Sequence, residues 1–218
     1  MSNSIYVLGV GGSTPVFCEI ALGCGYHIEG LYHYNDSRNG EVVNGMTIIG
    51  SFDDLFENDI RGVNFLLTMG DPEIRHNLSK RLVAAGAILP TLIHPTAVIS
   101  PNCTISSEGV IIGPMAIVQS NARVCSNVAI WDMALICHDA IVESDVFIGP
   151  KALVGAAVHV NSFAYIGQGA ILISHKAKEI ECKAIVGAGA VVVKSVAKYQ
   201  VVAGVPADNI KHLIRKEH

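Results

Sequence analysis

The sequence has few aromatic and few charged residues, which excludes an aromatic-rich core and argues against a strongly charged binding surface. Only 6% of the 218 residues are aromatic and 16% are charged, whereas 50% are hydrophobic, so aliphatic side chains must form most of the core. The 15 basic and 19 acidic residues form no long run of one sign, which argues against a nucleic-acid or anionic membrane partner. No stretch of about 18 apolar residues lacks a polar interruption, so no membrane-spanning helix is expected.

The cysteines also lack the spacing that a zinc site or a disulfide framework needs. No CxxC pair occurs among the six cysteines. The first ten residues have no charged start followed by a long apolar segment and a cleavage site, so no signal peptide is expected. We therefore expect free thiols in a reducing cytoplasm and no metal site. The cysteines are Cys18, Cys24, Cys103, Cys125, Cys137 and Cys182.

Up to about residue 90, strand-like and helix-like segments alternate. Apolar runs at 5–10 and 63–68 are typical of buried parallel strands, and 27–34 and 46–49 are expected to be strands as well. Helical spacing covers 14–22 and 72–85, and the second helix is expected to bury Ile74, Leu78, Leu82 and Val83. This order predicts a small Rossmann-like α/β domain with a parallel sheet over residues 1–92.

Beyond residue 93 a different period takes over. Aliphatic residues recur every sixth position from Ile112 to Leu172, and Ala or Val stands four positions after each of them except Leu172. Ile99 and Ile105 share this register one residue out of phase, and it resumes at Ile180. The repeating aliphatic positions are Ile112, Val118, Val124, Ile130, Ile136, Val142, Ile148, Val154, Val160, Ile166, Leu172, Ile180, Val186 and Val192.

A period of six fits neither an α-helix nor a long two-sided strand. It fits a coil whose short flat sides each point one aliphatic residue inward, with a small residue at the tight corner. Three such sides close a triangular turn, so residues 93–218 are expected to form a parallel β-helix. The interval from Leu172 to Ile180 is eight residues, so Ser174, His175 and Lys176 are expected to bulge outward. Such a bulge either reaches a ligand or a neighbouring subunit, or is a tolerated surface insertion.

Several motifs resemble one group of left-handed β-helix acyltransferases. The group comprises nucleotide-sugar N-acetyltransferases of the PglD type and sialic acid O-acetyltransferases of the NeuD type. Its members are homotrimers that bind acetyl-CoA between adjacent β-helices and a sugar nucleotide on the amino-terminal domain. The resemblance therefore implies this fold, this assembly and acetyl-CoA as co-substrate. The motifs are 9–13 (GVGGS), 30–36 (GLYHYND), 69–75 (MGDPEIR), 93–97 (IHPTA) and 201–207 (VVAGVPA).

The resemblance also implies the catalytic residues. His138 would be the general base and Asp139 the acid that orients it, as in the His-Glu pair of the PglD-like enzymes. Ala156 lies one full turn of three six-residue units beyond His138, and its backbone N–H matches the family's oxyanion donor. Gly155 would leave room for the thioester. His94, His159 and His175 are weaker catalytic candidates.

Further positions follow for the coenzyme and the sugar nucleotide. The family's coenzyme contacts fall at Phe147, Gly167, Gln168 and Ala188. The segment Gly9–Thr14 fits part of the GxGxxG fingerprint, with Thr14 in place of the last Gly, and can present backbone N–H groups to a diphosphate. The candidate contacts are Gly11, Gly12 and Ser13 for the diphosphate and His33, Tyr34 and Asn35 for the base.

These residues predict an acetyl-CoA-dependent enzyme that acetylates the 4-amino group of a UDP-linked 4-amino-4,6-dideoxy sugar. Transfer would be direct, because no Cys or Ser stands beside an evident base. One alternative is O-acetylation of a sialic acid or related sugar by the same base. A second is a non-catalytic trimer that binds sugar nucleotides, and a dinucleotide-dependent oxidoreductase is a distant third.

Overall fold

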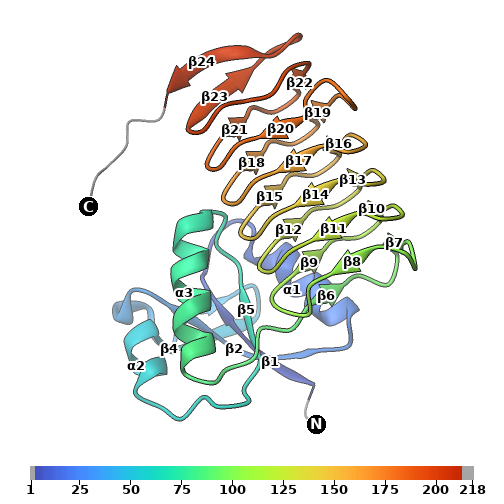
Figure 1. Cartoon of the computed structure of the whole chain (residues 1–218). Coiled ribbons are helices and arrows are strands. Elements are labelled where there is room, and N and C mark those ends of the chain that lie inside the picture. The colour runs from blue at the N-terminus through green and yellow to red at the C-terminus, as the bar shows by residue number, and fades with distance from the viewer. Residues whose placement is uncertain (1–2, 213–218) are drawn as a thin grey trace. The chain divides into compact units, whose positions relative to one another are not determined.

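The computed structural model describes residues 3–212, which form two compact units. The first unit runs to Pro95 and includes Ser107–Gly109, and the second contains Thr96–Ser106 and the chain from Val110 onward. Each unit has its own core (Figure 1).

The first unit is built on one sheet with the strand order β3-β4-β2-β1-β5. Strands β1, β2, β4 and β5 are mutually parallel, whereas β3 pairs antiparallel with β4 at the edge. The strands are β1 (Ser4–Leu8), β2 (His27–His33), β3 (Val42–Val43), β4 (Met46–Ser51) and β5 (Phe65–Leu67), and β6 (Leu92–Ile93) ends the unit.

The helices of this unit are α1 (Thr14–Gly23), α2 (Phe52–Phe56) and α3 (Pro72–Ala84), with a short 3-10 turn η1 (Asp36–Arg38). Helix α3 begins where the Asp71 side chain accepts hydrogen bonds from the N–H groups of Glu73 and Ile74, with Pro72 in the first turn. Leu55 of α2 and Leu78 and Leu82 of α3 share one apolar cluster with Leu8, so both helices cover the same face of the sheet.

Two local features differ from the sequence-based expectation. Ile74 and Val83 are exposed, and the buried side of α3 carries Arg75, Leu78, Ser79 and Leu82 instead. The sheet is also mixed rather than wholly parallel, because β3 and β4 form a hairpin around 44–45. Both turn residues, Asn and Gly, have positive φ, as a tight hairpin turn requires, so this dipeptide was the missed sequence signal.

The second unit is a three-sided parallel β-helix whose strands have two residues each up to β22 (Figure 1). Face I contains β7 (Val98–Ile99), β10 (Ile117–Val118), β13 (Leu135–Ile136), β16 (Leu153–Val154), β19 (Ile171–Leu172) and β22 (Val191–Val192). Face II contains β8 (Thr104–Ile105), β11 (Arg123–Val124), β14 (Ile141–Val142), β17 (His159–Val160) and β20 (Glu179–Ile180). Face III contains β9 (Ile111–Ile112), β12 (Ala129–Ile130), β15 (Phe147–Ile148), β18 (Tyr165–Ile166), β21 (Ile185–Val186), β23 (Gln200–Ala203) and β24 (Asp208–His212).

The six-residue period has the predicted physical basis. Every repeating aliphatic residue from Ile112 to Val192 is at most 1% exposed, and so are the Ala and Val residues that stand four positions after them, from Ala116 to Ala190. Leu135 pairs with both Ile117 and Leu153, so a regular coil consists of three six-residue units. At each corner between residues 113 and 190 one residue has a φ near +60°, including Asp139 and Ala157, which turns the chain from one face to the next.

The coil length changes at the two places where the sequence departs from the period. Val98 pairs with Ile117, so the coil between them is one residue longer than a regular one, which accounts for the phase shift of Ile99 and Ile105. Ile171 pairs with Val191, so this coil is longer by two residues, which are the extra residues between Leu172 and Ile180. At the end of the β-helix, β24 folds back antiparallel on β23.

All six cysteines are free. None of the described helices has both the length and the apolar character needed to cross a membrane.

Candidate active site

His138 lies at an exposed corner between faces I and II, two residues after the end of β13. Its Nδ1 is 2.7 Å from Oδ2 of Asp139, and both side chains are more than half exposed. The backbone N–H of His138 donates to Oε1 of Gln119 at 2.9 Å, and Nδ2 of Asn121 donates to Oδ1 of Asp139 at 3.1 Å. Gln119 and Asn121 belong to the preceding coil, so that coil holds the pair in place.

The electrostatics of this pair decide which imidazole nitrogen is available. The hydrogen bond from His138, followed by that from Asn121, lowers the pKa of the Asp139 carboxyl below its ordinary value. An ionised carboxylate only accepts hydrogen bonds, so Nδ1 of His138 must carry the hydrogen that it shares with Asp139. In the neutral imidazole, Nε2 then has the free lone pair, which can take a proton from a nucleophile.

Ala156 lies one coil beyond His138, as the regular period predicts. The N–H of its neighbour Ala157 donates to the carbonyl oxygen of His138 at 3.1 Å. The N–H of Ala156 itself donates to Oγ of Ser174 at 2.8 Å, and Ala156 is only 5% exposed. The N–H expected to act as oxyanion donor is therefore already engaged by a side chain from the next coil.

Gly155 serves the packing between coils. A Cβ at this position would lie 2.3 Å from the carbonyl oxygen of Leu172 and 2.5 Å from the amide nitrogen of Ser174. The space beside its Cα is thus filled by protein backbone rather than left open. Glycine is required here because the two coils approach so closely.

The residues expected to contact the coenzyme lie at a different edge. Gly167, Gln168 and Ala188 lie at the corner between faces III and I, which face I separates from His138. A Cβ on Gly149 would lie 2.7 Å from the amide nitrogen of Gln168, and one on Gly167 would lie 2.6 Å from that of Ala188. The lack of side chains at these two glycines lets successive coils stack closely beneath those amides.

Phe147 is packed into an aromatic ladder on face III. Its ring stacks on Tyr165 with a centroid distance of 4.7 Å and lies 5.8 Å from the Trp131 ring. Phe147 is 7% exposed, so little of its ring is left to touch a ligand.

Hydrogen bonds of Thr14 and Thr68 stabilise the glycine-rich loop that follows β1. Oγ1 of Thr14 accepts the Gly11 N–H at 2.9 Å and lies 3.0 Å from Oγ1 of Thr68, and both threonines are 2% exposed. Thr14, at the position of the last glycine of the fingerprint, thus braces the loop. Gly11 and Gly12 are exposed, with open space beside each Cα.

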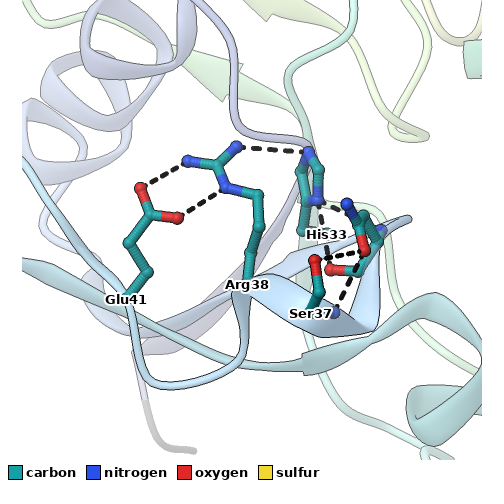
Figure 2. A network of polar contacts seen from close by, with 5 residues as sticks. His33, Ser37, Arg38 and Glu41 are labelled. Atoms are coloured by element: carbon teal, nitrogen blue, oxygen red, sulfur yellow. Dashed lines mark hydrogen bonds and ion pairs between the residues drawn. The ribbon is translucent and has the colours of Figure 1, made fainter.

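His33, Tyr34 and Asn35 follow β2 and differ sharply in exposure. His33 is 5% exposed, whereas Tyr34 is 77% exposed and covers the His33 ring at a centroid distance of 4.2 Å. Nδ1 of His33 accepts the Asn35 N–H at 3.1 Å, and the Arg38 guanidinium lies 3.4 Å from its Nε2 (Figure 2). Arg38 also makes two 2.6 Å hydrogen bonds to Glu41. The buried His33 side chain therefore supports the loop after β2 through its contacts with Tyr34 and Asn35, and these two residues lie at the loop surface.

An acidic depression beside this loop was missed by the sequence analysis. It is lined by Tyr34, Asn35, Asp36, Ser51, Asp53 and Asp54. The sequence pattern that could have revealed part of it is Ser51 followed three residues later by Asp54, because the two form the capping box of α2.

The three other candidate histidines, His94, His159 and His175, differ in their surroundings. His159 is on face II, with Nε2 3.1 Å from Oε1 of Glu143. The His94 ring lies against the Cα of Gly23 in the first unit. His175 is an exposed corner residue in the coil of Ser174. Within residues 3–212, no three His, Cys, Asp or Glu side chains gather as a metal site would require.

The sequence matches no protein-family model. The structure is similar to that of a perosamine N-acetyltransferase variant from Caulobacter crescentus, solved in complex with CoA and GDP-perosamine. The TM-score is 0.86 at 25% identity, over 95% of this chain and 97% of that chain. The acetyltransferase domain of PglB from Neisseria gonorrhoeae, in complex with acetyl coenzyme A, matches with a TM-score of 0.86 at 27% identity, over 96% and 100% of the two chains.

A third similar structure, WeeI from Acinetobacter baumannii, has a TM-score of 0.81 at 24% identity, over 94% of this chain and 99% of that chain, and supports the fold. The similarity to the first two structures extends over both units and agrees with the resemblance found in the sequence. The chain is therefore a left-handed β-helix acyltransferase of the sugar N-acetyltransferase type.

Proposed function

We propose that the protein transfers the acetyl group of acetyl-CoA to the 4-amino group of a UDP-linked 4-amino-4,6-dideoxy sugar, with His138 as general base. The observation that carries this proposal is the 2.7 Å contact between Nδ1 of His138 and the Asp139 carboxylate at an exposed edge. CoA or acetyl-CoA in the two similar N-acetyltransferase structures supports the co-substrate. GDP-perosamine in one of them supports a sugar nucleotide as acceptor. Because that nucleotide is GDP, the test below compares UDP- and GDP-linked acceptors.

Asp139 holds the His138 ring so that Nε2 faces outward as a proton acceptor. The amine attacks the thioester carbon, forming the C–N bond, and its proton passes to Nε2. When the C–S bond breaks, sulfur leaves with the electron pair and receives a proton from the imidazole. The products are an acetamido sugar and the free CoA thiol.

Direct transfer is favoured because the neighbouring thiol is a poor nucleophile. Cys137 immediately precedes His138, and burial raises the pKa of its thiol above the ordinary value. A protonated thiol does not attack a thioester effectively. The amine of the acceptor is then the nucleophile that His138 serves.

The coenzyme would lie along the edge between faces III and I, at Gly167, Gln168 and Ala188. Gln168 and Ala188 are exposed and belong to successive coils, whose backbones lie about 4.8 Å apart. Backbone amides so spaced suit the amide groups along the pantetheine arm. Phe147 would support the coenzyme site indirectly, by stacking on Tyr165, more than by direct contact with the coenzyme.

We also propose a homotrimer with active sites between subunits, because His138 and the coenzyme amides lie at different edges of one prism. The outward positions of face I are all aliphatic: Val98, Ile117, Leu135, Leu153, Ile171 and Val191. The outward positions of face II are mostly polar: Thr104, Arg123, Ile141, His159 and Glu179. An apolar face next to a polar one fits burial of face I against another subunit.

The first unit, residues 1–92, would hold the nucleotide. Gly11, Gly12 and Ser13 would receive the diphosphate at the start of α1, while Tyr34 and Asn35 would contact the nucleotide base, with His33 as support.

Six free cysteines fit a reducing compartment, so we propose a cytoplasmic enzyme.

The test measures release of the CoA thiol and mass of the acceptor, with UDP- and GDP-linked 4-amino sugars as substrates. His138→Ala should reduce turnover by at least about 100-fold, the usual contribution of a general base. His159→Ala is the matched control, because His159 also pairs with a carboxylate but lies on face II.

Near-normal turnover by the His138 variant would remove this residue from the mechanism. Transfer to hydroxyl acceptors alone would support a sialic acid-type O-acetyltransferase instead. Failure to bind acetyl-CoA in a calorimetric titration would leave a non-catalytic sugar-nucleotide scaffold.

A further inference from the structure

The Ser174 hydroxyl covers the backbone N–H of Ala156. The N–H donates to Ser174 Oγ at 2.8 Å, and Ala156 is 5% exposed whereas Ser174 is half-buried. A group that approaches this N–H from solvent therefore meets the serine oxygen first. For the N–H to reach a thioester oxygen directly, the bond to Ser174 would have to break.

A hydroxyl can pass a hydrogen bond on, because it accepts and donates at once. Ser174 Oγ accepts from Ala156, and within residues 3–212 its own hydrogen is donated to no other group. Accepting a hydrogen bond polarises the O–H and makes it a stronger donor. The Ser174 hydroxyl therefore accepts a hydrogen bond from the buried Ala156 N–H and can donate its own hydrogen to a group on its outer side.

The position of Ser174 in the stack suits this role. It stands one regular coil beyond Ala156, which in turn stands one regular coil beyond His138, so the three occupy equivalent corner positions. The bond to Ala156 draws Oγ toward the coil adjacent to His138. The N–H groups of Lys176 and Ala177 both donate to the Ile173 carbonyl, at 3.1 Å and 2.9 Å, which holds the turn around Ser174.

We propose that the Ser174 O–H, backed by the Ala156 N–H, is the hydrogen-bond donor that stabilises the oxyanion during acetyl transfer. This inference rests on the proposed function. When the amine bonds to the thioester carbon, the carbonyl π electrons move to oxygen, and the Ser174 hydroxyl donates to that charge without losing its proton. When the C–S bond breaks, those electrons restore the C=O bond and the hydroxyl is unchanged.

The experiment compares Ser174→Ala with Ser174→Thr in the full-length enzyme. Loss of one oxyanion donor reduces kcat by about 100- to 1,000-fold in well-studied enzymes. We expect a decrease of that order for the alanine variant, with the calorimetric Kd for acetyl-CoA changed less than about 3-fold, and most of the activity retained by the threonine variant. Ser144→Ala is the control, because Ser144 pairs with Ser126 at the corner between faces II and III.

An alanine variant as fast as the wild type, or faster, would overturn the inference, since the hydroxyl would then only cover the Ala156 amide. Ser174→Cys, with a weaker donor of similar size, should be intermediate in kcat and provides the test if the alanine variant does not fold. Wild-type transfer and the His138→Ala result test the proposed function separately. A wild-type enzyme that transfers no acetyl group would refute that function, whereas a normal Ser174→Ala enzyme refutes only the role of Ser174.

Discussion

Nδ1 of His138 and Oδ2 of Asp139 lie 2.7 Å apart although the two residues are adjacent in the chain. In a strand, adjacent side chains point to opposite faces. Asp139 has a φ of +60°, and this left-handed corner conformation turns its side chain toward the preceding residue. The corner that keeps the coil triangular therefore also assembles the base and its partner.

Asp139→Asn should reduce kcat while leaving the affinity for acetyl-CoA unchanged. An amide can present either N or O to Nδ1, so the imidazole loses its fixed tautomer and Nε2 is no longer always the free base. We expect a decrease of at least about 10-fold, measured by thiol release under saturating substrates. Asn121→Ala, which removes only the second partner of the carboxylate, should have a smaller effect. Equal kcat for Asp139→Asn and wild type would contradict an orienting role.

The same carboxylate predicts a pH dependence of stability. Its pKa in the folded protein lies below the ordinary value of 3.8, so it favours the folded state above that pH. As the pH falls through the folded pKa, protonation removes this contribution. The difference in urea midpoint between wild type and Asp139→Asn should therefore be largest above about pH 4 and shrink as the solution becomes more acidic. A difference that grows with acidity would contradict the assignment.

Gly167→Ala should destabilise the β-helix and weaken coenzyme binding together. The new Cβ would lie 2.6 Å from the Ala188 nitrogen, closer than a real contact allows. Forcing two coils apart should cost about 1–3 kcal/mol, which thermal unfolding can measure. Gly11→Ala is the control for stability, since a Cβ there meets nothing within 4 Å. An unchanged Tm for Gly167→Ala would show that the coils are not packed as described.

Leu153→Glu should disrupt the assembly, because it places a charge at an outward position of the aliphatic face I. Burying an unpaired carboxylate between subunits is strongly unfavourable. Sedimentation or light scattering should show a smaller species than the wild type, together with loss of activity. Ile141→Glu, on the polar face II, should leave the assembly intact. Dissociation caused by the second variant but not the first would place the interface on the other face.

The period of six determined the β-helix because its cause is local: each unit needs one inward aliphatic residue and one small corner residue, and both are visible in the letters. The adjacency of His138 and Asp139 is local in the same way. The buried face of α3 was predicted only in part: Leu78 and Leu82 are buried as expected, whereas apolar Ile74 is exposed. Polar Arg75 and Ser79 are buried in its place, because packing against the sheet as well as helical periodicity decides which side is covered.

The bond between Ala156 and Ser174 was beyond sequence analysis for a related reason. The regular period stacks these residues, but the direction of the Ser174 hydroxyl depends on the turn formed after it, where two extra residues break the repeat. Gly155, expected to make room for a thioester, instead permits close contact with the Ser174 backbone. The pattern of inward residues thus came from the sequence alone. The tertiary structure decided which donor faces outward, because that depends on how tightly one coil lies on the next.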